Sequence, residues 1–163
     1  MFNRKLLTIV GFKIVWLNCI LGEIYINSLF GLYSGIIFLI IFILFIDNKL
    51  IAIKVISFFS ISGYIFDSLL SYFNFYSVDA QINIFFLPIW FLVLWPSFCC
   101  LLVEVLAFLK KKFFISTFLG LFVGPLTYYA GISTNLAVSS GIISFLLISF
   151  YWSLMMFVYS KFF

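Results

Sequence analysis

The stretch that decides the fold is residues 57–74, SFFSISGYIFDSLLSYFN. It is apolar enough to lie in a membrane, yet it contains an acid, Asp67. Six of its polar residues recur every three or four positions, a spacing that places them on one face of a helix. They are Ser57, Ser60, Tyr64, Asp67, Ser71 and Asn74. A membrane helix turns such a face toward other helices or a water-filled cavity, so we expect Asp67 to point into a helix bundle.

The composition extends this expectation to the whole chain. Of 163 residues, 66% are hydrophobic and 9% are charged, whereas a soluble domain has about 25% charged residues. Six apolar segments approach or exceed the roughly 20 residues that span a bilayer. They lie near 6–23, 29–46, 51–73, 84–109, 113–132 and 139–160. We therefore predict an all-α, polytopic integral membrane protein: six transmembrane helices in a single domain, residues 1–163, with a bend at Pro96 in the fourth helix.

The basic residues predict the orientation of these helices. Arg4 and Lys5 precede the first segment, Lys49 follows the second, residues 110–112 are three lysines after the fourth, and Lys161 lies at the C-terminal end. The first, third and fifth connections contain no Lys or Arg. Because basic residues remain on the cytoplasmic side, both termini are expected to be cytoplasmic.

The same composition argues against several classes of function. The net charge of +4 is accounted for by the connections, and no basic face with interleaved aromatic residues predicts nucleic-acid binding. Histidine is absent, and no nucleotide, metal or hydrolase motif is present, so we expect no cofactor and no metal site. An enzymatic role is disfavoured by the same observations, although it stays open. The partners that we expect are membrane lipids and, as an alternative, other membrane proteins.

Asp67 is the principal candidate for a functional residue. It lies ~9 Å from the outer end of its helix, with no basic residue at the same depth. Four residues could line an outward-facing cavity with it: Asn18, Tyr64, Trp90 and Tyr128. The alternative is that Asp67 forms a hydrogen bond to a neighbouring helix and only positions it. Intramembrane acids are usually functional, which keeps the first interpretation open.

Two further groups of residues have structural interpretations. Lys13 and Glu104 lie at similar depths from the cytoplasmic side, so they could form an ion pair; alternatively, Lys13 could extend to the headgroups. In the fifth segment Gly120, Gly124, Pro125 and Gly131 suggest a face for close helix packing. Ser140 and Ser144, in the sixth segment, have the same spacing and are the expected partner face.

Several motifs together resemble a family of small bacterial inner-membrane proteins, domain of unknown function 2878. They are Trp16 with Leu21-Gly22, Gly63-x-x-x-Asp67-Ser68-Leu69-Leu70, Pro88-x-Trp90 through Leu94-Trp95, and Gly120-x-x-x-Gly124-Pro125-Leu126-x-Tyr128-x-Ala130-Gly131. The chain departs from the family pattern at Glu23, where a small uncharged residue is usual. The resemblance implies a multi-pass protein of the bacterial inner membrane without an established activity, and it favours a lipid-related role.

Three functions are compatible with these observations. The first is binding or translocation of a small or lipidic molecule through an outward-facing cavity around Asp67. The second is a structural or assembly subunit of a membrane protein complex. The third is a membrane-embedded lipid-modifying enzyme, the least favoured because the chain has few acid–base groups.

Overall fold

The computed structural model describes residues 3–163, which divide into two compact units. The first unit combines the chain up to Ile65 with Ala80–Ala107, and the second combines Phe66–Asp79 with Phe108–Phe163. In the described part of the chain, five helices are long and apolar enough to cross a membrane, and one apolar helix is shorter. The protein is therefore a multi-pass membrane protein with an all-α fold.

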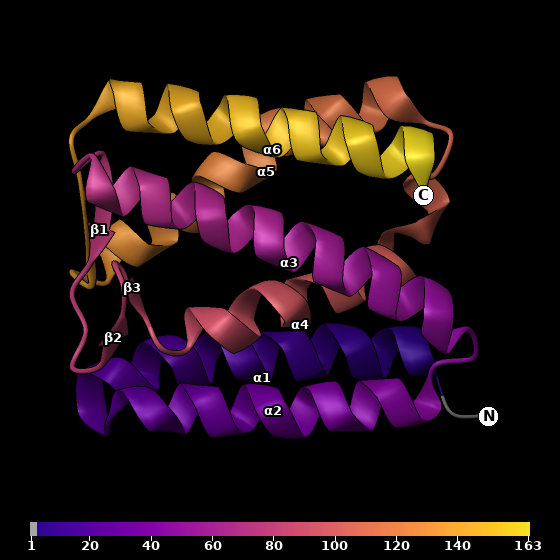
Figure 1. Cartoon of the computed structure of the whole chain (residues 1–163), viewed down its shortest axis with the longest axis horizontal. Coiled ribbons are helices and arrows are strands. Elements are labelled where there is room, and N and C mark those ends of the chain that lie inside the picture. The colour runs from indigo at the N-terminus through magenta and orange to yellow at the C-terminus, as the bar shows by residue number, and fades with distance from the viewer. Residues whose placement is uncertain (1–2) are drawn as a thin grey trace. The chain divides into compact units, whose positions relative to one another are not determined.

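The first unit is built on a helical hairpin of α1 (Arg4–Tyr25) and α2 (Ser28–Phe45). Only two residues connect these helices, and the side chain of Asn27 caps α2 by accepting a hydrogen bond from the Phe30 N–H at 3.1 Å. The helix α4 (Phe91–Glu104) packs against both, and Figure 1 shows it alongside α1. The part of α3 (Lys49–Tyr72) that precedes Phe66 belongs to the same unit. Two short strands, β2 (Asn83–Ile84) and β3 (Leu87–Pro88), form a hairpin that leads into α4.

The second unit is built on α5 (Phe113–Ser133) and α6 (Ile142–Phe162). A Cβ atom at Gly120 would collide with the backbone carbonyl of Trp152, and one at Gly124 would collide with the Trp152 ring. Small residues therefore allow the two helices to approach closely here. The residue that meets this face is Trp152, not the expected pair Ser140 and Ser144.

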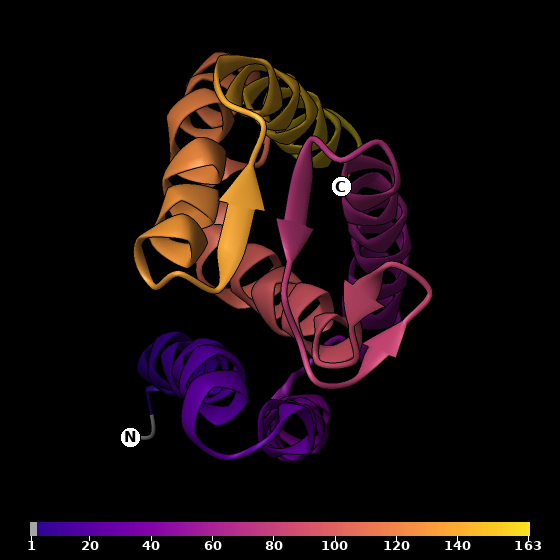
Figure 2. The same ribbon diagram turned by 90° about the vertical axis from the view of Figure 1, so that its left-hand side faces the viewer.

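The connections of the second unit contain a small sheet. The strands β1 (Tyr76–Val78) and β4 (Ala137–Ser139) pair antiparallel, with Ser77 opposite Val138 (Figure 2). The hydroxyl of Ser144 donates to the Phe75 carbonyl at 2.5 Å, and Ser140 contacts Ser144 at 2.8 Å. Ser140 and Ser144 therefore link the start of α6 to the residue that precedes β1 by hydrogen bonds.

Five of the six predicted segments agree with the helices to within three residues at each end. The fourth, 84–109, was predicted as one long helix, and this is wrong. Residues 83–88 form the β2–β3 hairpin, α4 has 14 residues, or ~21 Å, and a 3₁₀ helix, η1 (Leu106–Leu109), follows. Hydropathy could not separate these parts because the hairpin and the helix are equally apolar. The one local signal for the hairpin is Pro88, which favours an extended backbone at the residue before it.

The buried face of α3 also differs from the predicted polar face. Ala52, Val55 and Phe59 are at most 1% exposed, and the face continues through Gly63 and Asp67. Ser57 is exposed, and Ser60, Tyr64 and Ser71 are half-buried beside this face. Aliphatic and aromatic packing therefore sets the orientation of the helix, and Asp67 is the polar side chain that it buries.

Candidate functional site

The expected site residue Asp67 is buried in the second unit, with 3% of its surface exposed. The hydroxyl of Tyr128, on α5, donates a hydrogen bond of 2.5 Å to its Oδ1. The hydroxyl of Tyr76, on β1, donates to the Tyr128 backbone carbonyl at 3.3 Å. The two tyrosine rings meet edge to face, with centroids 5.0 Å apart. Asp67, Tyr128 and Tyr76 thus form one connected group that is buried in this unit.

The strand β1 places Tyr76 in this group, outside the membrane-spanning helices. Burial raises the pKa of the Tyr76 phenol, and the nearby Asp67 carboxylate raises it further. Both effects disfavour the phenolate form, so Tyr76 stays a proton donor over the ordinary pH range. Gly131 leaves space for this hydroxyl, because a Cβ atom there would come within 2.6 Å of it.

The other residues expected to line a cavity with Asp67 belong to the first unit and have separate surroundings. Asn18 is half-buried on α1. The hydroxyl of Tyr64 donates to the Ile84 carbonyl at 3.0 Å. The indole of Trp90 donates to a different acid, Glu23, at 2.8 Å.

Glu23 is a buried acid that is not among the site residues predicted from the sequence. It lies in the last turn of α1 and is 6% exposed. Three donors of the chain itself reach its carboxylate: the Ser28 hydroxyl at 2.7 and 2.9 Å, the Gln81 backbone N–H at 2.6 Å and the Trp90 indole at 2.8 Å. We call Glu23, Ser28, Gln81 and Trp90 the Glu23 cluster. It fastens the β2–β3 segment to the α1–α2 connection.

Two further hydrogen bonds complete this attachment. The Gln81 side chain donates to the Glu23 carbonyl at 3.1 Å, and the Ile82 N–H donates to the Ser28 hydroxyl at 3.1 Å. The sequence contained one signal for this cluster: Glu23 is an acid in a connection without basic residues, at the position where the chain departs from the pattern of the family that it resembles. Ser28 is a near neighbour in the sequence, but Gln81 and Trp90 lie too far along the chain for any spacing rule to identify.

A groove of about 280 Å³ lies between α3 and α4 in the first unit. Its lining is mostly apolar: Ser60, Ile61, Tyr64, Ile65, Phe91, Leu92, Trp95 and Pro96. The two hydroxyls of the lining have partners within the chain, since Ser60 contacts the Cys99 sulfur at 3.6 Å and Tyr64 donates to Ile84. Pro96 has no N–H to donate to the Leu92 carbonyl one turn earlier.

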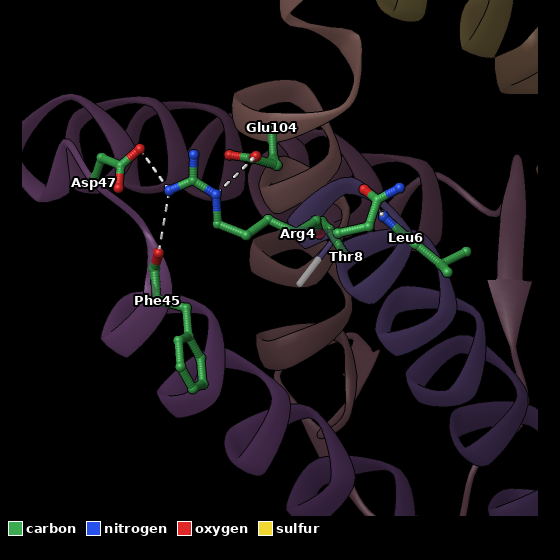
Figure 3. Close-up of polar contacts among 7 residues, drawn as sticks. Arg4, Leu6, Thr8, Phe45, Asp47 and Glu104 are labelled. Atoms are coloured by element: carbon green, nitrogen blue, oxygen red, sulfur yellow. Dashed lines mark hydrogen bonds and ion pairs between the residues drawn. The ribbon is translucent and has the colours of Figure 1, made fainter. Parts of the chain in front are cut away.

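At the opposite end of the α1–α2 hairpin, Arg4 contacts two acids (Figure 3). Its Nη1 atom lies 2.5 Å from Asp47 Oδ2 and 3.5 Å from the Phe45 carbonyl, and its Nε atom lies 3.6 Å from Glu104 Oε1. We call Arg4, Asp47 and Glu104 the Arg4 cluster. The expected Lys13–Glu104 ion pair does not form among residues 3–163, because Arg4 takes this acid and Lys13 is exposed on α1.

Among residues 3–163, no three His, Cys, Asp or Glu side chains are grouped so that they could hold a metal ion. The cysteines Cys19, Cys99 and Cys100 are free and buried.

Comparison with known proteins gives a family and no assigned activity. The family described as protein of unknown function (DUF2878) matches residues 5–158, which is nearly the whole chain. Searches among curated proteins and among solved structures found no match. The chain therefore belongs to the DUF2878 family of proteins of unknown function.

Proposed function

We propose that this protein binds a lipidic molecule within the membrane, by holding a hydrocarbon chain in the groove between α3 and α4. The observation that carries the proposal is the groove itself, which at about 280 Å³ approaches the size of ordinary small-molecule sites. The groove presents mainly apolar side chains to a ligand, because the Ser60 and Tyr64 hydroxyls already form hydrogen bonds within the chain.

The depth of the groove favours a hydrocarbon chain as its occupant. Ser60 and Ile65 lie ~17 and ~24 Å along α3, a helix of 24 residues and ~36 Å. Those positions correspond to the acyl region of a bilayer. Ile61 and Leu92, on the two walls, are 62% and 43% exposed, so the groove opens on the surface that contacts lipid.

Binding is supported more strongly than translocation through a cavity around Asp67. Asp67 is buried and bonded to Tyr128, an arrangement that suits a fixed structural group. A role as an assembly subunit is the second candidate, and one observation favours it. Both buried acids, Glu23 and Asp67, are engaged by donors of the chain itself, which favours fixed helix packing over chemistry.

A photoreactive phospholipid with a diazirine in its acyl chain tests the proposal in proteoliposomes. We expect crosslinks to concentrate on residues 60–65 and 91–96. Leu92→Trp should fill the groove and remove them. Ile53→Trp is the matched control, because Ile53 is 48% exposed on α3 and lies outside the groove. Crosslinks spread evenly over the exposed positions of α3, or unchanged by Leu92→Trp, would contradict the proposal.

We further propose that the protein resides in the bacterial inner membrane with both termini in the cytoplasm. The support is the alternation of basic and uncharged or acidic connections. Reporter enzymes fused after Lys111 and after Asp79 should report opposite sides of the membrane. The same side for both fusions would contradict this orientation.

A further inference from the structure

The β2–β3 hairpin has an unusual tip. Phe85 is the first of the two residues between the paired strands and has a φ of +55°, a conformation that glycine usually provides in a two-residue hairpin. A bulky side chain is strained there. Phe85 is also 85% exposed, and Phe86 beside it is 49% exposed. The chain thus exposes a large apolar side chain at a residue whose backbone conformation is unfavourable for large side chains.

The base of the hairpin is fixed at one end of α1 and α2. Gln81 and Trp90, on its two sides, donate hydrogen bonds to Glu23 in the last turn of α1. The Ile82 N–H donates to Ser28, the first residue of α2. The hairpin therefore lies at the level where the α1–α2 hairpin turns, which is where a bilayer changes from acyl chains to headgroups.

In the described part of the chain, the surroundings of the tip carry no exposed charge, and exposed apolar side chains lie there beside amides such as Asn83. No Lys, Arg, Asp or Glu lies between Asp79 and Glu104 in the sequence. At the α1–α2 connection Tyr25 is 78% and Ile26 is 56% exposed, and Ile82 at the base of the hairpin is 38% exposed. Aromatic and aliphatic side chains gathered at this level are typical of the membrane interface. A protein-binding surface would more often include Arg and be surrounded by a polar rim.

We propose that the β2–β3 hairpin is an interfacial anchor, whose tip inserts Phe85 into the boundary between lipid headgroups and acyl chains. The partner is a lipid surface and not a second protein. The anchor lies directly before α4, so it sets the depth of a helix too short to fix its own position by length. The 14 residues of α4 span ~21 Å, against ~30 Å for the hydrocarbon core.

Spin labels at the tip and at the base of the hairpin test the anchor in full-length protein. Cys19, Cys99 and Cys100 are replaced by alanine, and a nitroxide is attached to Phe85→Cys or, as the matched control, to the exposed neighbour Asn83→Cys. In phosphatidylcholine–phosphatidylglycerol vesicles, the label at 85 should collide more with oxygen than with a water-soluble nickel chelate, and the label at 83 should show the reverse. A label at 85 that meets nickel as often as the one at 83, or is shielded from both reagents, would overturn the proposal.

A second variant keeps the native cysteines, so that it does not depend on the folding of the alanine background. Phe85→Trp adds one tryptophan to the four that are present. The added emission should be quenched by lipids brominated near the headgroup, and little by aqueous iodide. Quenching of the added emission by iodide alone would place the tip in water and reject the anchor.

Discussion

The two ends of the α1–α2 hairpin are both fastened by charged side chains, but in opposite ways. At one end the Glu23 carboxylate is 6% exposed and accepts hydrogen bonds from three neutral donors. At the other, the Arg4 side chain is 39% exposed and faces Asp47, which is 78% exposed, and Glu104. The first cluster is a buried charge satisfied by dipoles, and the second is an ion pair near water.

This difference indicates that the burial of a cluster determines how much it stabilises the fold. Full charges on both partners matter less. Hydrogen bonds to a buried charge contribute about 1.5–3 kcal/mol each, and a donor left without its partner in the interior is costly. Exposed ion pairs lose most of their attraction to water and salt. The neutral donors around Glu23 should therefore stabilise the first unit more than the acids around Arg4.

The largest effect is expected for Glu23→Ala. Three donors lose their acceptor, two of them, on Ser28 and Trp90, buried, so the free energy of unfolding should fall by about 3–5 kcal/mol. Unfolding in mixed dodecyl maltoside–dodecyl sulfate micelles, followed by helicity, measures this loss. Glu23→Gln is the control that keeps the size and one acceptor oxygen, and it should lose less. Equal stability of the alanine variant and the native chain would show that the cluster contributes nothing.

Trp90→Phe should have the next largest effect. The substitution keeps most of the ring and removes the single N–H that donates to Glu23 Oε2, so we expect a loss of about 1.5–2 kcal/mol in the same titration. Trp16→Phe makes the same chemical change at a half-buried position on α1 outside the cluster. A similar loss for both variants would mean that ring size, and not the hydrogen bond, is responsible.

Arg4→Gln should have a smaller effect than either variant of the Glu23 cluster. Its closest partner, Asp47, is largely solvated, and a side chain near water gains little from such an ion pair. Thermal unfolding in detergent measures this directly. A loss that exceeds the loss of Glu23→Ala would reverse the comparison between the two ends.

High salt should increase the contrast between the two clusters, and it should change the free energy of unfolding less than any of the substitutions. At about 1 M NaCl the screening length falls to ~3 Å, so the remaining difference between Arg4→Gln and the native chain should disappear. The difference for Glu23→Ala should persist, because the donors are neutral and the acid is buried. The unfolding titration is repeated at low and high salt, and a salt-insensitive Arg4 effect would argue for packing by the arginine stem instead.

The sequence predicted the helices well because membrane-spanning segments are long and apolar, and that signal is local. It predicted the start of α4 poorly, since residues 84–90 are as apolar as the helix that follows. The depth estimate from helical rise placed Tyr128 at the level of Asp67, and the two are hydrogen-bonded. Such an estimate depends only on distance along each helix.

The Glu23 cluster could not be predicted in the same way. Its donors Gln81 and Trp90 lie 58 and 67 residues after Glu23, in a connection whose backbone has no periodic pattern. The contacts of Arg4 are not predictable either: the sequence indicates only a topology signal at Arg4, and depth pairs Lys13 with Glu104, whereas the acid contacts Arg4. A side chain at a helix end can reach further than a rise per residue implies, so equal depth alone does not select the partner.

The long separation within the Glu23 cluster has a consequence for synthesis. Chains are made from the N-terminus, so α1 and α2 are complete well before residues 81–90 leave the ribosome. During that interval the Glu23 carboxylate has only the Ser28 hydroxyl from its final set of donors, and water must supply the rest. The arrival of Gln81 and Trp90 displaces that water and closes the cluster. A nascent chain stopped before Gln81 would therefore contain the α1–α2 hairpin without the two distant hydrogen bonds that complete the Glu23 cluster.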